Sequence, residues 1–350
     1  MKLPSSASSR LPTPARENRG RWGPRLQILL PWLLLLALLL LPLGKPSANI
    51  IKLLFITAVW TTTSVAWNLL GGMAGQVSFG FAVFYGLGAY STGLLMHAGW
   101  SPYLAFLAGG VVAAAASFLV GLPTFRLRGP YFVIATIGVT EAVRVIMNNL
   151  DITGGSSGYR ILEKSLYNPL EHYYTAITAV TLAVAISIVI SRSKFGLALR
   201  AIKQDEDAAA DLGVNPYAAK LKVHAIAAAL VGIAGGIYAR RAAFFYPGDV
   251  FAFQTGISIL LMPVIGGIGT VWGPVLGGVI FGTVEEELVA NFPNFHLLLY
   301  GGLLILIILF EPDGLMGLLR RLFRRRREDS GSENTDEVFW GRGRVAGRKL

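Results

Sequence analysis

The sequence predicts an all-α polytopic membrane protein: a bundle of about eight to ten transmembrane helices, some broken by glycine, with a helical cytoplasmic excursion. Composition is the first observation, because 53% of the 350 residues are hydrophobic and 15% are charged, against about 25% charged in soluble proteins. The second is a series of apolar runs of bilayer length, about 20 residues each. The third is the charge, since residues 1–25 and 320–350 each carry a net +5 of the total +11.

Ten apolar runs are candidate spans, and the last three are short. The first follows a basic stretch but is long for a signal peptide, and no clear cleavage site follows it, so it is interpreted as a span. The eighth and ninth are equally compatible with half-spans or a re-entrant pair, which sets the range of eight to ten. The runs are 26–43, 51–70, 77–96, 103–124, 131–150, 174–190, 223–239, 256–271, 273–288 and 295–310.

Charged loops predict the orientation. Basic residues flank spans on the cytoplasmic side, so both tails (1–25, disordered, and 319–350) are expected in the cytoplasm and the number of spans is even. The Arg126/Arg128 loop and the loop 192–222 then also fall inside, while the loop 151–173 falls outside. The pair Arg240 and Arg241 is the one misfit. Basic tails of this kind attract anionic lipid; a nucleic-acid site would need its charge on a folded surface, so no nucleic acid is expected.

Glycine-rich stretches inside the membrane domain, residues 26–318, predict both tight packing and helix breaks. Most of the 41 glycines are attributed to close helix approach. The cluster 266–278, with Pro263 and Pro274, is not expected to form one continuous helix. Gln76 and Ser78 follow another cluster, 71–75. They either line a polar path or satisfy backbone groups freed by the break.

Glu141 and Arg144 stand near the middle of the fifth span, three residues apart and hence on one helix face. A charge at that depth is costly and normally faces the bundle interior or a water-filled cavity. We interpret the two as a structural pair that neutralises itself inside the bundle, and keep a role in a translocation path or gate as the alternative.

The charged stretch 193–223 is longer than a link between two spans requires. A short helix is predicted over 199–212, ended by Gly213, and the Asn215-Pro216 turn follows. Alternating apolar and charged residues suggest that this helix docks on a partner. Its small side chains Ala208, Ala209 and Ala210 would allow close approach to a groove. Four charges, Arg200, Lys203, Asp205 and Asp207, are expected at the rim of that contact.

Enzymatic chemistry is not indicated. The chain has no cysteine, its four histidines are scattered without metal-ligand spacing, and no Ser/His/Asp arrangement is visible. The phosphate-binding pattern G-x4-G-K-S/T is also missing. We therefore expect no catalytic residues, no metal and no bound cofactor, and any ATP must be used by partner subunits.

The stretch 207–223 resembles the EAA-x3-G-x9-I loop with which ABC importer permeases contact their ATPases: Asp207-Ala208-Ala209, then Gly213, then Val223, with Asp for Glu and Val for Ile. Further stretches narrow the resemblance to the M-type permease subunit of the branched-chain amino acid (Liv-type) ABC importers, over about 49–317. They are 68–80, 127–132, 136–138 with Glu141 and Arg144, 153–158, 195–202, 266–274 and 311–315.

The resemblance implies a multi-pass subunit of the bacterial inner membrane that forms half of a translocation path for branched-chain or related hydrophobic amino acids. It also implies the partners: a homologous second permease, two ATPase subunits and an extracytoplasmic solute-binding protein. Contact with the ATPase would fall on Arg200, Asp207, Ala208, Ala209 and Gly213. Two alternatives remain: a permease of this kind for urea, short amides or aromatic carboxylates, or a secondary transporter driven by an ion gradient.

Overall fold

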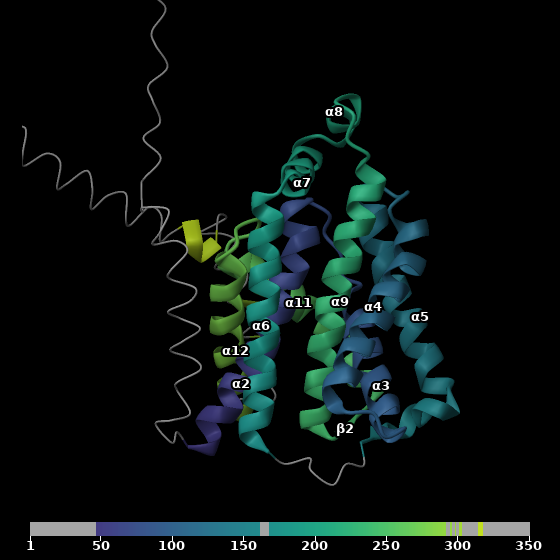
Figure 1. The fold of residues 1–350 in the computed structure, drawn as a ribbon, viewed down its shortest axis with the longest axis vertical. Helices are drawn as coiled ribbons and strands as arrows, with labels where there is room; N and C mark the ends of the chain where they lie inside the picture. The colour runs from purple at the N-terminus through teal and green to yellow at the C-terminus, as the bar shows by residue number, and fades with distance from the viewer. Residues whose placement is uncertain are drawn as a thin grey trace, which may run out of the picture. The chain divides into compact units, whose positions relative to one another are not determined.

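A computed structural model describes residues 47–161 and 168–291, together with residues 295, 298, 301–302 and 314–317. The expected first span, both tails and most of the tenth span lie outside these residues. The described part is an all-α helical bundle, as predicted (Figure 1). Within it, six helical segments are long and apolar enough to cross a membrane: Ala48–Met73, Pro102–Thr124, Pro130–Asn149, Pro169–Arg192, Pro216–Ala242 and Pro247–Gly266.

The helices begin where the sequence offers proline or a capping side chain. Four long helices start with proline, whose missing N–H costs nothing in a first turn, and Asn168 and Asn215 cap two of these by accepting backbone N–H groups. The elements are α2 (Ala48–Asn68), η2 (Leu69–Met73), α3 (Phe81–His97), α4 (Pro102–Thr124), α5 (Pro130–Asn149), η3 (Asp151–Thr153), η4 (Gly155–Ser157), β1 (Tyr159–Arg160), α6 (Pro169–Arg192), α7 (Lys194–Gln204), α8 (Glu206–Asp211), α9 (Pro216–Ala242), β2 (Phe244–Phe245), α10 (Pro247–Val250), α11 (Phe253–Gly266) and α12 (Gly273–Asn291).

Helix α9 lies at the centre of the bundle and packs against α3 and α4, while α2 packs against α6 and α12. Glycines permit the closest approaches: a Cβ on Gly88 would lie 2.0 Å from the carbonyl oxygen of Gly232, and one on Gly235 would lie 2.0 Å from that of Tyr85. The small residues therefore let α3 and α9 meet backbone to backbone, which is how helices gain contact in lipid.

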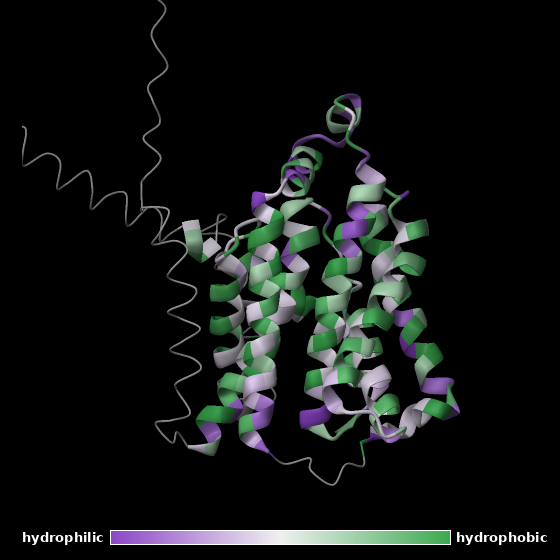
Figure 2. Cartoon of the chain, in the orientation of Figure 1, coloured by the Kyte–Doolittle hydropathy of each residue, from purple (hydrophilic) through white to green (hydrophobic). Residues whose placement is uncertain are grey.

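Hydrophilic residues gather at both ends of the bundle, with hydrophobic residues between them (Figure 2), but the elements at the two ends differ. Polar α7 and α8 lie at one end, and the Arg126/Arg128 loop is tied to them by an ion pair between Arg128 and Asp207. At the other end β1 and β2 form an antiparallel pair, Tyr159 opposite Phe245 and Arg160 opposite Phe244. The two loops predicted to share the cytoplasmic side thus do share one end.

Arg240, half of the misfit pair in the charge analysis, lies at the end of α9 away from α7. It is only 2% exposed, and its Nη1 donates to Glu171 Oε1 over 2.7 Å. Tyr103 donates to the same carboxylate oxygen at 3.2 Å. This arginine is a buried, neutralised residue, so it carries no information about which side of the membrane it flanks.

Both predicted helix breaks are present. Helix α2 ends in the π-helical turn η2, and the chain then runs without helix until Phe81, so the third span begins four residues later than expected. Helix α11 ends at Gly266, and α12 starts at Gly273 after a turn in which Gly267 and Gly269 have φ of +122° and +78°. Pro274 occupies the first turn of α12, where a proline is tolerated.

Candidate functional site

The excursion between α6 and α9 is two helices rather than the single helix predicted over 199–212. Helix α7 ends at Gln204, and Asp205 has an extended backbone, with φ −156° and ψ 118°. Its carboxylate accepts the backbone N–H groups of Asp207 and Ala208, over 2.9 and 3.0 Å. Because an aspartate in this role starts a helix, it ends α7 and begins α8 in a new direction.

Gly213 ends α8, as predicted. Its φ of +86° lies in the left-handed region, its N–H donates to Ala210 O, and the N–H of Val214 donates to Ala209 O. This pair of hydrogen bonds is the Schellman motif, which requires a left-handed residue and strongly favours glycine. No atom lies within 4 Å of where a Cβ would stand, so the backbone conformation alone demands glycine here.

The four charges expected at a partner's rim all have partners within the chain. Arg200 donates to the carbonyl oxygens of Gly196 and Ser191. Asp207 forms a two-point ion pair with Arg128, at 2.9 and 3.2 Å, and this hydrogen bond and charge raise the pKa of Arg128 above its ordinary value. Lys203 donates to Gly72 O at 2.9 Å, and Asp205 caps α8. These residues orient the two helices on the bundle.

A second ion pair, which the sequence analysis missed, fixes α8 to α9. Lys220 is 6% exposed along its side chain, and its Nζ lies 2.6 Å from Glu206 Oε2. Tyr217 adds a hydrogen bond from its hydroxyl to Leu122 O, over 2.9 Å. No sequence spacing signals these contacts, because the Asn215-Pro216 turn separates α8 from α9.

The surface that α8 leaves open is small and partly apolar. Ala208 and Ala210 are exposed, whereas Ala209 is 2% exposed, so the expectation that all three alanines face a partner is wrong for Ala209. The helical period turns Ala209 inward, toward the bundle. Leu212, which sequence reasoning overlooked, is 85% exposed beside Gly213. It gives the tip of α8 a single apolar projection.

Ser78, one of the two polar residues beside the first break, is 1% exposed. Its hydroxyl accepts the N–H of Gly80 at 3.1 Å, and its carbonyl oxygen accepts from Trp67 Nε1 at 2.8 Å. Gln76 is half-buried, and its N–H donates to Leu70 O. The hydroxyl of Ser78 thus satisfies a backbone N–H at the break, as one of the two alternatives expects, whereas the Gln76 contact involves only its backbone.

Glu141 and Arg144 form the ion pair that the sequence predicts, but not inside the bundle. Their side chains are 52% and 37% exposed within this chain, because α5 lies at the edge of the bundle (Figure 1). It packs inward only through the stripe Phe132, Thr136, Thr140 and Met147. The pair therefore stands at mid-span on a helix face that the described residues cover only in part.

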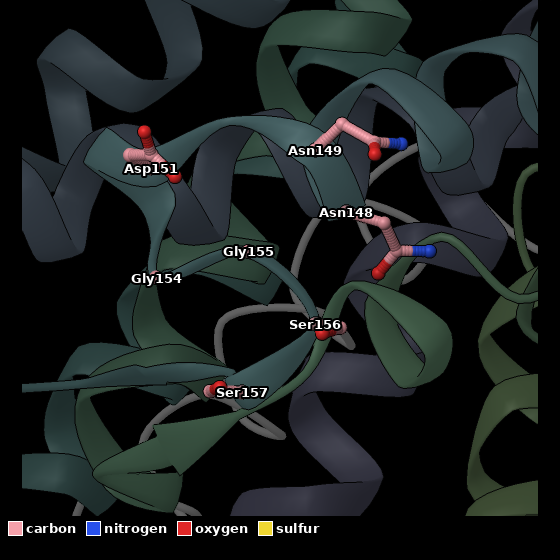
Figure 3. Close-up of a pocket in the computed structure, with 7 residues that line it drawn as sticks. All are labelled: Asn148, Asn149, Asp151, Gly154, Gly155, Ser156 and Ser157. Carbon is pink, nitrogen blue, oxygen red and sulfur yellow. The ribbon is translucent and has the colours of Figure 1, made fainter.

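A polar pocket of about 370 Å³ lies at the end of α5 remote from α8. Figure 3 shows the side chains of Asn148 and Asn149 on one side of it and Asp151 on the other. The backbone N–H groups of Gly154, Gly155 and Ser157 on its floor are used in turns of the loop itself. Among the described residues, no three His, Cys, Asp or Glu side chains gather as a metal site.

The sequence of this bundle matches a known protein family. The family model described as the branched-chain amino acid transport system permease component matches residues 49–308. The high-affinity branched-chain amino acid transport system permease protein LivM of Escherichia coli strain K12 is 31% identical, over 82% of this chain and 75% of its own length. The chain belongs to this family of ABC importer permeases.

More distant relatives include the permease protein LivH of Escherichia coli strain K12, which is 24% identical over 74% of this chain and 92% of its own. The autoinducer 2 import system permease protein LsrC of Yersinia enterocolitica serotype O:8 is 25% identical over 69% of each chain. No solved structure matches. This permease is thus a multi-pass inner-membrane transport subunit and not an enzyme. Its family match includes both helix breaks, α5 and the α7–α8 excursion.

Proposed function

We propose that this permease forms half of a translocation path for branched-chain amino acids, and that a homologous second permease covers the exposed face of α5. The Glu141–Arg144 pair carries the proposal. An ion pair at the middle of a span is costly against lipid and normally faces protein or a water-filled cavity. The described residues leave the pair about half exposed, which supports a second subunit as the remaining wall.

The α7–α8 excursion is the proposed contact with two ATPase subunits, which supply the energy. Leu212 and the exposed alanines offer an apolar tip, and the ion pairs of Asp207 and Glu206 connect that tip to the rest of the bundle. The concentration of basic residues at this end supports a cytoplasmic placement of it and of both termini. The polar pocket at the opposite end would then face a solute-binding protein.

Branched-chain amino acids are proposed as substrates because the names of the LivM and LivH relatives state them. The LsrC relative belongs to a system that imports autoinducer 2, so substrate class varies among proteins this similar. Urea, short amides and aromatic carboxylates remain competing substrates. An ion-gradient-driven secondary transporter remains the competing mechanism.

The test is uptake into proteoliposomes that contain this permease with its second permease and ATPases, and a binding protein added outside. We expect uptake of labelled leucine that requires ATP inside and persists with an ionophore. Excess isoleucine and valine should compete, whereas urea, benzoate and autoinducer 2 should not. Gradient-driven uptake by this chain alone would overturn the ABC mechanism. Competition by urea, benzoate or autoinducer 2 would instead identify that solute as a substrate.

A further inference from the structure

The two glycine-rich breaks, far apart in the sequence, meet at one point beneath α7. The side chain of Asn68, at the end of α2, bridges to the second break: its Nδ2 donates to Thr270 O over 2.8 Å and its Oδ1 accepts from Gly269 N over 2.8 Å. A Cβ on Gly72 would lie 1.9 Å from the Asn68 Oδ1 and 2.7 Å from Gly269 N. The buried side-chain amide of Asn68 thus holds the turn 267–270 against the turn 71–75, a contact that we call the Asn68 clamp.

Lys203 joins this clamp to the excursion. Its ammonium donates to Gly72 O at 2.9 Å, and a Cβ on Gly269 would stand 3.0 Å from that ammonium nitrogen. The stem of the lysine crosses Gly75, where a Cβ would lie 3.0 Å from Lys203 Cγ. Three glycines from two breaks therefore leave room for one lysine from α7. Its positive charge sits at the C-terminal end of α2 and η2, the end that favours cations.

We infer that Lys203 is a positioning residue that transmits movement of α7 to the two broken helices. This inference rests on the proposed docking of ATPases at α7–α8. The other anchors of the excursion hold α8 elsewhere: Asp207 pairs with Arg128 in the loop between α4 and α5, and Glu206 pairs with Lys220 on the continuous helix α9. The Lys203 contact ends on the backbone of the π-helical turn η2, directly before the break at Ala74. Asn68 makes both breaks respond together.

The experiment uses the complete importer in proteoliposomes and compares Lys203→Met, which keeps the apolar stem, with Lys203→Arg, which keeps the charge and donors. Lys194→Met is the matched control, since Lys194 lies on the same helix with an exposed side chain. Three quantities are measured: copurification of the ATPases, ATP hydrolysis with and without loaded binding protein, and leucine uptake. Membrane abundance of each variant is recorded alongside.

Lys203→Met should keep normal abundance, ATPase copurification and basal hydrolysis, while the uptake per ATP hydrolysed falls about tenfold, a typical size for a coupling effect. Lys203→Arg should recover most of that ratio, and Lys194→Met should match the unaltered protein. Loss of ATPase binding, loss of abundance or an unchanged ratio in Lys203→Met would each overturn the inference. If the unaltered importer shows no ATP-driven uptake, the proposed function itself has failed instead.

Discussion

Three of the four ion pairs described above differ in how far their side chains are buried. Arg240 and Lys220 are almost fully buried. Arg240 pairs with Glu171 of α6, and Lys220 pairs with Glu206 of α8. Glu141 and Arg144 are about half exposed on the edge helix α5. Removing one partner of a buried pair leaves an unpaired charge and costs about 3–5 kcal/mol. Removing one partner of either of the first two pairs should therefore destabilise this chain by itself. Removing Glu141 or Arg144 should have that effect only when another subunit covers α5.

The first prediction concerns Glu141 and Arg144. In cells that also produce the second permease, Glu141→Ala and Arg144→Ala should each reduce the amount of assembled complex, because the remaining charge loses its partner. The double variant should assemble better than either single one. Arg126→Ala, in an exposed loop, is the control. The measurement is copurification of the two permeases. A double variant no better than the worse single variant would argue for a role in transport.

At the scale of elements, α8 is a helix of only six residues, and a particular residue sets each of its two ends. Asp205 starts it and Gly213 ends it. The end of α3 is closed in the same way: Gly99 has φ +85°, its N–H donates to Met96 O, and the N–H of Trp100 donates to Leu95 O. The same motif therefore stands at both ends of the bundle, one copy on the proposed docking segment and one remote from it.

Gly213→Val and Gly99→Val form a matched pair for the second prediction. Both impose a left-handed conformation on a β-branched residue, at a cost of about 1–2 kcal/mol or more, and neither glycine has an atom within 4 Å of a would-be Cβ. We expect similar small losses of abundance. Only Gly213→Val should also lose ATPase copurification and uptake. Equal loss of ATPase binding in the two variants would remove α8 from the proposed contact.

Much of the helical framework could be predicted from the sequence, since apolar runs and proline starts place α4 and α5 within one residue of their expected limits. The break at Asp205 could not be predicted. The stretch is charged and rich in helix-forming residues, and nothing in it indicates that the Asp205 carboxylate caps a new helix instead of lying within a continuous one. The inward turn of Ala209 and the Glu206–Lys220 pair depend on how α8 meets α9. The position of α5 at the edge depends on packing that apolar runs do not encode.

For the whole molecule, the described loops divide between two ends in the alternating order that the charge analysis predicts. The Arg128–Asp207 contact joins two loops at one end, and the β1–β2 pair joins two at the other. The ion pair of buried Arg240 with Glu171 accounts for one of the two misfit arginines, whereas Arg241 is partly exposed. Which end faces the cytoplasm rests on the basic residues of the loops and tails.

Reporter fusions test this third prediction. Fusions after Arg128 and after Gly213 should both report the cytoplasm, whereas a fusion after Ser157, the last residue of η4 at the opposite end, should report the outside. A fusion after Arg327, beyond the described residues, should report the cytoplasm if the number of spans is even. A cytoplasmic signal from Ser157 would contradict the alternation of the spans.

The short β1–β2 pair has a mechanical consequence. It fastens the loop after α5 to the end of α9, so this end of the central helix is tethered while the other end carries α8. Helix α9 has 27 residues and is about 40 Å long. A displacement of α8 would therefore reach the strand pair only through the length of α9, which α3 and α4 hold along its sides.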